Sequence, residues 1–151
     1  MTAAPVAPTI PPAEDLLTRT LNTIAADREA GGDYERSFRC VDRMLQELGE
    51  TDLAERLSDM ISPARPWQDV ADLFRILVWS TSDSGLALLR TMENWLLAAA
   101  DLRQVQIALH IDVCPFIDPS RMRRVLTDVA EQFPQVRERC EQLIQSRGRQ
   151  P

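Results

Sequence analysis

The chain has 151 residues, of which 44% are hydrophobic and 26% charged, and this composition predicts one globular domain with an ordinary apolar core. Its net charge of −6 disfavours a polyanion such as nucleic acid as the main partner. All 17 basic residues are arginine, which excludes lysine Schiff-base chemistry and is typical of the coding bias of a GC-rich bacterial genome.

The cysteine spacing and the hydropathy pattern indicate in which cellular compartment the protein works. Cys40, Cys114 and Cys140 are far apart and odd in number, which argues against a disulfide framework and favours a reducing environment. The sequence has no run of about 18 apolar residues, so no membrane span is predicted. Its first residues lack the basic and apolar regions of a signal peptide, and we therefore expect a cytoplasmic protein.

The two ends of the chain differ from its middle. Residues 1–12 hold four of the ten prolines and predict a flexible, polyproline-like tail. Residues 13–147 show helical periodicity and predict the folded domain, whereas residues 148–151 are expected to fray.

Amphipathic segments broken by glycine predict an antiparallel helical hairpin within the first 48 residues. In its second helix, apolar residues step by four and three positions, which is coiled-coil-like spacing. We expect this stripe to be the buried face of the helix; its members are Tyr34, Phe38, Val41, Leu45 and Leu48.

A helix is predicted to begin at Pro66, and its segment 73–79 is apolar on nearly every side, so we expect this segment at the centre of the domain. Trp67, Trp79 and Trp95 are the residues most costly to expose and are expected in the core. Tryptophan is also the usual anchor of protein interfaces, so Trp79 and Trp95 are candidate binding residues as well.

The stretch 101–119 carries two competing periods. Alternating apolar residues over 105–113 fit a half-buried strand, whereas apolar steps of three and four fit a helix. Asp101 is a suitable helix cap, and Pro115 would end the helix near Val113 or Cys114. We favour the helix, because a two-stranded sheet with the segment 73–79 would be marginal by itself.

His110 is the only histidine, and on a helix it would share one face with Cys114. With Asp112 nearby, these residues are candidates for a metal site or a Cys–His nucleophilic pair. The chain has no second histidine and no Cys-x-x-Cys motif, so a hydrogen-bonded histidine and a structural cysteine are favoured. We predict no metal and no cofactor, and keep His110, Asp112 and Cys114 as candidate binding residues.

Arg121, Arg123 and Arg124 form a basic stripe near the C-terminus. Residues 117–151 carry 7 arginines against 5 acidic residues, whereas the preceding residues carry 10 against 18. The stripe is a candidate surface for an acidic protein or for phosphates. A solvated face is favoured, with the arginines paired to the carboxylates of Asp128, Glu131 and Glu138.

An apolar triplet with spacing of four and three recurs four times, with starting positions 36, 35 and 34 residues apart; the triplets begin at Leu17, Leu53, Leu88 and Met122. Each is followed by a second amphipathic segment, which predicts stacked helical hairpins. The expected fold is therefore all-α, a single-domain bundle of about seven to eight helices, with stacked hairpins as one form of it. An α+β fold with a small sheet from 73–79 and 105–113 is the alternative.

No motif fixes a chemistry, and we expect a non-enzymatic module that binds another protein, as an adaptor, chaperone, immunity or regulatory protein does. Homo-oligomerisation is compatible with this interpretation, and no membrane partner is expected. The first alternative is a helical ligand-binding or enzymatic domain that uses His110, Asp112 and Cys114. The second is weak nucleic-acid binding through the C-terminal arginines, which the acidic net charge disfavours.

Overall fold

The computed structural model describes residues 12–111 and 118–148, and every regular element in these ranges is helical. The predicted all-α fold is therefore confirmed for the described part of the chain. The elements are α1 (Pro12–Ala30), α2 (Glu35–Leu48), α3 (Leu53–Met60), α4 (Trp67–Ser80), α5 (Leu86–Ala98), α6 (Leu102–Leu109), α7 (Pro119–Gln132), the 3₁₀ turn η1 (Pro134–Val136) and α8 (Arg137–Gly148).

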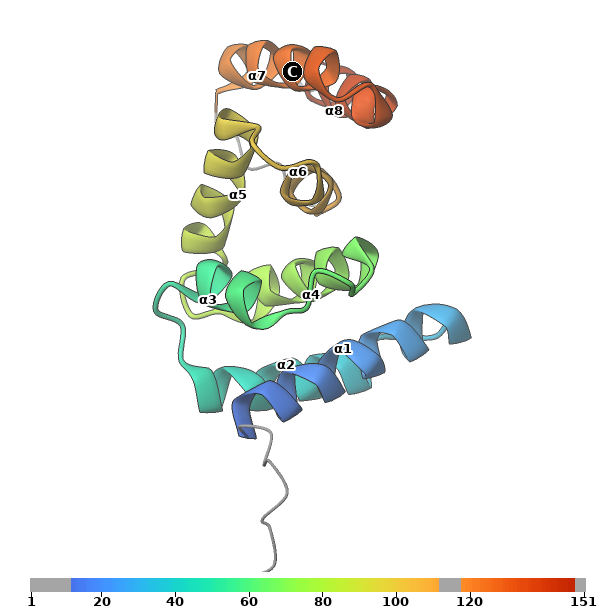
Figure 1. Cartoon of the computed structure of the whole chain (residues 1–151), viewed down its shortest axis with the longest axis vertical. Helices are drawn as coiled ribbons and strands as arrows, with labels where there is room; N and C mark the ends of the chain where they lie inside the picture. The colour runs from blue at the N-terminus through green and yellow to red at the C-terminus, as the bar shows by residue number, and fades with distance from the viewer. Residues whose placement is uncertain (1–11, 112–117, 149–151) are drawn as a thin grey trace, which may run out of the picture.

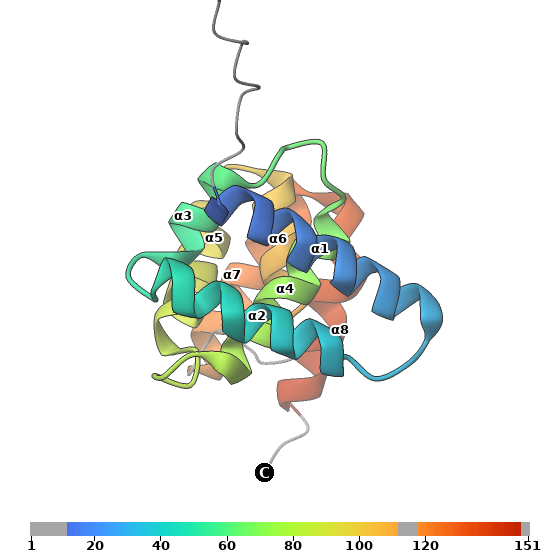
Figure 2. The same ribbon diagram turned by 90° about the horizontal axis from the view of Figure 1, so that it is seen from below.

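The helices follow one another along the long axis of the molecule in chain order (Figure 1). The α1–α2 hairpin forms one end and the α7–α8 pair forms the other. Seen from below, α1 and α2 lie across α4, and both helices contact it (Figure 2). Helix α5 runs along the long axis, from the level of α3 and α4 to that of α7, with α6 beside it.

The repeated triplet locates the first helix of each pair. The four triplets lie on α1, α3, α5 and α7, and their first two members are buried in each case; these residues are Leu17, Leu21, Leu53, Leu57, Leu88, Met92, Met122 and Leu126. The layers nevertheless do not repeat regularly, because α5 lies along the long axis while its counterparts lie across it (Figure 1). The sequence period therefore predicts where the helices are and not how they are oriented.

The α+β alternative is wrong. Residues 73–79 lie within α4, and the segment starting at 105 lies within α6, which packs against α4 as a helix. The expected cap is present, since the Arg103 backbone N–H donates to Asp101 Oδ1 at 2.9 Å. Helix α6 ends at Leu109, however, and His110 is its C-cap, so the predicted continuation to Val113 or Cys114 is also wrong.

A buried ionic cluster joins α1 to α4. Arg28 Nη2 donates to Asp69 Oδ1 at 2.5 Å, and Arg28 Nη1 donates to Asp72 Oδ2 at 2.8 Å. Asp69 is only 3% exposed. Arg65 and Arg75 lie 3.5 and 3.2 Å from Asp69 and Asp72, respectively, so both buried carboxylates are compensated from two sides.

A second polar anchor sets the rotation of α2. The Ser37 N–H and hydroxyl donate to Oδ2 of the buried Asp27 at 3.2 and 2.6 Å, and Arg36 donates to Oδ1. The hydrogen bond from the Ser37 side chain, followed by those from Arg36, lowers the pKa of Asp27 below its usual range. Because Ser37 is held inside, Val41 and Met44 become the buried positions of α2.

The predicted α2 stripe is therefore wrong in part. Of its five members only Val41 is fully buried, and Phe38 is 39% exposed. The coiled-coil spacing predicted the helix correctly. It did not predict its rotation, which the hydrogen bonds between Ser37 and Asp27 set.

The described helices include none long and apolar enough to cross a membrane. Helix α1 begins at Pro12, so most of the predicted proline-rich tail lies outside the described residues, as do residues 149–151.

Candidate functional site

Aromatic side chains gather on the surface where α2 passes the C-terminal end of α4. A shallow hollow of about 280 Å³ is lined by Tyr34, the N-cap of α2, by Phe38 of α2, and by Arg75, Ile76 and Trp79 of α4. Trp79 is 69% exposed, more than any other large apolar side chain in the described part of the chain. We call these five residues the aromatic surface.

Trp79 was expected in the core, and the structure shows that this prediction is wrong. Leu73 and Leu77 fill the core side of α4 and are fully buried. Trp79 follows Asp72 by seven residues and Arg75 by four, so the three share the polar side of the helix. Arg75 Nη2 lies 3.2 Å from Asp72 Oδ1, so the two residues that precede Trp79 on this side of the helix form an ion pair. This i, i+3, i+7 row was the signal in the sequence that could have placed Trp79 outside.

The other two tryptophans are packed. Trp95 is half-buried on α5, with its ring 6.0 Å from that of Phe74 in an edge-to-face arrangement at 83°. Trp67 lies at the start of α4, with its ring 4.5 Å from that of His110. The predicted binding residue Trp95 is therefore part of the packing around α4 and is not among the aromatic-surface residues.

His110 is partly buried at the end of α6. Its Nδ1 lies 2.8 Å from the carbonyl oxygen of Gln106, and its ring packs on Trp67 at an interplanar angle of 58°. Burial lowers the pKa of His110 below its usual range, so the ring is neutral at pH 7. These contacts are those of a hydrogen-bonded, packed histidine.

The other two members of the predicted His110 cluster, Asp112 and Cys114, lie outside the described residues. The argument that placed His110 and Cys114 on one helical face does not hold, because α6 ends before His110. Among the described residues, no group of three or more His, Cys, Asp or Glu side chains is arranged to hold a metal ion.

Of the two cysteines within the described ranges, Cys140 sits in unreactive surroundings. Cys140 is fully buried, and this burial raises the pKa of its thiol to about 11. The half-buried Cys40 lies with its Sγ 3.8 Å from Thr23 Oγ1. A thiol that stays protonated at neutral pH is a poor nucleophile.

The predicted arginine stripe lies on α7. Arg121 Nη1 lies 3.6 Å from Glu93 Oε1 of α5. Arg121 and Arg124 line a hollow of about 560 Å³ between α7 and the end of α5, together with Leu97. The expected pairing with Asp128, Glu131 and Glu138 is not found among the described residues, where Arg123 and Arg124 are exposed and make no ion pair within 4.0 Å.

A third hollow, of about 350 Å³, lies between the start of α3 and the start of α5. Its lining includes the carboxylates of Glu50, Asp52, Glu55 and Asp83, against one arginine, Arg90. Glu50 accepts hydrogen bonds from the backbone N–H and the hydroxyl of Ser82 at 2.6 and 2.7 Å. Asp83 caps α5, and the hydrogen bond from the Ala87 N–H chiefly lowers the pKa of this carboxyl.

The predicted candidate residues do not converge on one site. His110 lies beside Trp67, Arg121 beside Glu93, Trp95 beside Phe74, and Trp79 on the aromatic surface. The sequence did not identify Tyr34, Phe38, Leu86 and Leu97 as candidate binding residues, although each lines one of the hollows just described. No protein-family model, no curated protein and no solved structure matches this chain.

Proposed function

We propose that this chain is a non-enzymatic protein-interaction module that binds an apolar segment of another protein through the aromatic surface. The observation that carries the proposal is the 69% exposure of Trp79 on a helix that is otherwise largely buried. Adaptor, chaperone, immunity and regulatory proteins work in this way. Its cysteine pattern and composition favour action in the reducing cytoplasm of a bacterium.

Tryptophan and tyrosine are enriched among residues that dominate binding free energy, because a large rigid ring buries much area at little entropic cost. Trp79 stands on one side of the hollow and Tyr34 and Phe38 on the other. An aliphatic or aromatic side chain placed between them would be desolvated on both sides. The neighbouring Arg75 supplies a polar rim at the edge of the contact.

The enzymatic alternative has less support. The Nδ1 atom of His110 is engaged by a backbone carbonyl, and its ring packs against Trp67, so a substrate has only part of the imidazole to contact. Nucleic-acid binding has the exposed Arg123 and Arg124 in its favour and the net charge of −6 against it.

The test compares the full chain with two single variants after a partner has been captured and identified. Trp79→Ala should weaken binding by about 2 kcal/mol or more, which is the usual cost of losing an interface hot spot. Glu131→Ala changes an exposed residue of α7 that does not line the aromatic surface, and it should leave the affinity unchanged. Equal affinity of the Trp79→Ala variant and the wild type, measured by calorimetry, would refute the proposal.

A further inference from the structure

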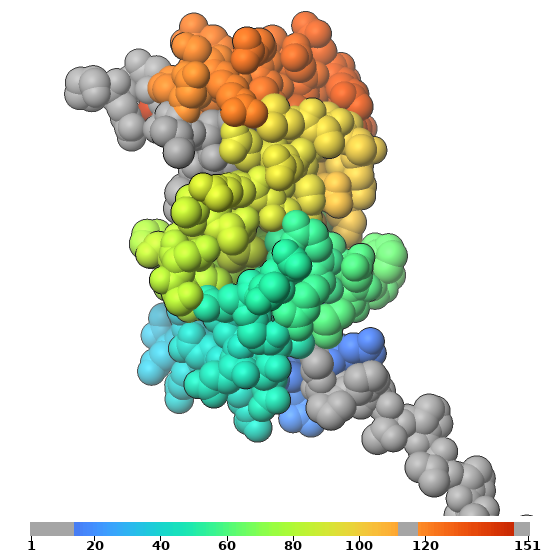
Figure 3. Space-filling model, turned by 90° about the vertical axis from the view of Figure 1, so that its left-hand side faces the viewer, coloured from blue at the N-terminus to red at the C-terminus, as the bar shows by residue number. Residues whose placement is uncertain are grey.

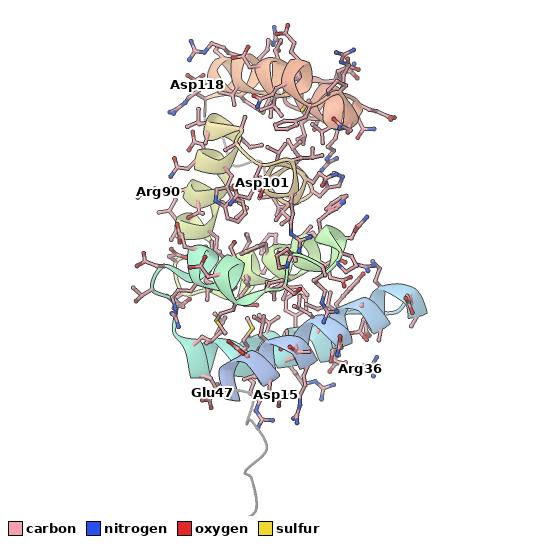
Figure 4. All side chains as sticks on the ribbon, viewed as in Figure 1. Asp15, Arg36, Glu47, Arg90, Asp101 and Asp118 are labelled. Atoms are coloured by element: carbon pink, nitrogen blue, oxygen red, sulfur yellow. The ribbon has the colours of Figure 1, made fainter. Side chains whose placement is uncertain are left out.

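We infer that the outer face of α5 is the contact between two antiparallel copies of this chain. Four residues, Leu86, Arg90, Glu93 and Leu97, follow one another on α5 with spacing of four, three and four. This spacing places them on one side of a helix, and we call them the outer row. Leu86 is 47% and Leu97 is 43% exposed, and Arg90 points away from the body of the molecule (Figure 4).

The outer row is complementary to the outer row of a second copy whose α5 runs in the opposite direction. In a twofold contact, if residue i meets residue j of the partner copy, then j meets i. A twofold axis at the midpoint of α5, between residues 91 and 92, pairs Leu86 with Leu97 and Arg90 with Glu93. One pairing is apolar, and the other joins opposite charges. The Glu93 side chain is 22% exposed and lies 3.6 Å from Arg121 of its own chain, so its carboxylate would be shared between that arginine and Arg90 of the second copy. A parallel arrangement would instead place Arg90 against Arg90 and Glu93 against Glu93.

The surfaces beside the two ends of α5 extend the same complementarity. Leu86 borders the hollow that contains four carboxylates and one arginine, and Leu97 borders the hollow that contains Arg121, Arg124 and one carboxylate, Asp128. Figure 3 looks onto this side: the yellow-green residues that begin α5 lie against the teal residues before α3, and the orange α7 lies at the opposite end. An antiparallel twofold therefore sets the arginine end of one copy on the carboxylate end of the other.

The proposed contact extends beyond α5 itself. Stable protein interfaces bury about 800 Å² on each partner. The 13 residues of α5 are too few for this by themselves. The hollows at the two ends bring in α3 and α7, and Leu86 and Leu97 fill the space between them with apolar contact. Because the partner is the same chain, this inference does not depend on what binds the aromatic surface.

The mass of the full chain in solution, measured by sedimentation equilibrium, tests the inference. The wild type should rise from one chain to two over the micromolar range. Leu97→Glu should raise the dimer dissociation constant at least about tenfold, because it puts a carboxylate into the apolar pairing. Phe38→Glu is the matched control, since Phe38 is exposed to a similar degree on α2 and should leave the mass unchanged. Circular dichroism checks that both variants are folded.

A charge exchange tests the pairing itself. Arg90→Glu alone and Glu93→Arg alone should each be monomeric, because each sets like charges against one another twice across the axis. Mixed in equal amounts, the two variants should form a dimer with one copy of each, since both Arg–Glu contacts are then restored. Native mass spectrometry resolves this species. A monomeric wild type, a dimer that tolerates both Leu97→Glu and Arg90→Glu, or a dimer lost only with Phe38→Glu would overturn the inference.

Discussion

The two ends of α4 reverse the usual assignment of polar and apolar residues. Near its N-terminus Asp69 is 3% exposed, whereas near its C-terminus Trp79 is 69% exposed. Asp69 can be buried because Arg28 and Arg65 reach it from α1 and from the connection before α4. Trp79 is exposed at the C-terminal end of α4, four residues after the half-buried Arg75 on the same side of the helix.

The difference shows that available partners, more than residue type, decide burial along this helix. A buried carboxylate is tolerated when its charge is compensated and its oxygens are hydrogen-bonded. The exposed Trp79 is the centre of the binding surface proposed above. The N-terminal end of α4 should therefore control the stability of the fold, and its C-terminal end should control binding to a partner. The following substitutions test this difference.

Removal of Asp69 should have the largest effect. Asp69→Ala leaves the Arg28 and Arg65 guanidinium groups close together with one carboxylate fewer. We expect a loss of about 3 kcal/mol in the free energy of unfolding, at the low end for a broken buried pair because the Arg28 side chain is 36% exposed. Urea denaturation measures the loss. The exposed Asp59→Ala is the control and should change the free energy of unfolding by less than about 0.5 kcal/mol.

The turn after Trp79 depends on a close backbone approach. Gly85 has φ of +82°, and a Cβ atom there would lie 2.8 Å from Val78 Cα. Gly85→Ala should therefore destabilise the chain by about 2 kcal/mol through clash and strain. Gly49 has φ of +71° with open space around it, and Gly49→Ala should cost only about 1 kcal/mol. Equal thermal stability of the two variants would contradict the clash.

The Asp27 anchor should make stability depend on acid pH. Its pKa is lowered from 3.8 by the Ser37 and Arg36 hydrogen bonds. The stabilisation from the ionised carboxylate is thus complete above that value and is lost as the pH falls through the lowered pKa of the folded state. The stability difference between wild type and Asp27→Asn should shrink below about pH 4. Urea titrations at several pH values measure it, with the exposed Asp42→Asn as the control.

Trp79→Ala should barely affect folding. Its side chain is mostly exposed, so the free energy of unfolding should change by less than about 0.5 kcal/mol. Trp95→Ala should cost about 2 kcal/mol, because it removes the ring packed edge-on against Phe74. A large loss of stability in the Trp79 variant would mean that this ring supports the fold, and the aromatic surface would no longer be a candidate binding site.

The smallest effect concerns the cysteines. The buried Cys140, with its thiol pKa raised to about 11, should react with iodoacetamide only on unfolding. The half-buried Cys40 should react first of these two under native conditions. Peptide mass spectrometry distinguishes the sites, and fast native labelling of Cys140 would show that the end of the α7–α8 pair opens readily.

The helical content, the first helix of each pair and the cap at Asp101 were determined by the sequence, because periodicity and capping are local properties. The rotation of α2 and the burial of Asp69 and Asp72 were decided only by the tertiary structure. Each depends on contacts between different helices: Asp27 with Ser37, and Arg28 with Asp69 and Asp72. Periodicity shows that a helix has an apolar side, but a partner from elsewhere in the chain fixes which residues that side finally buries.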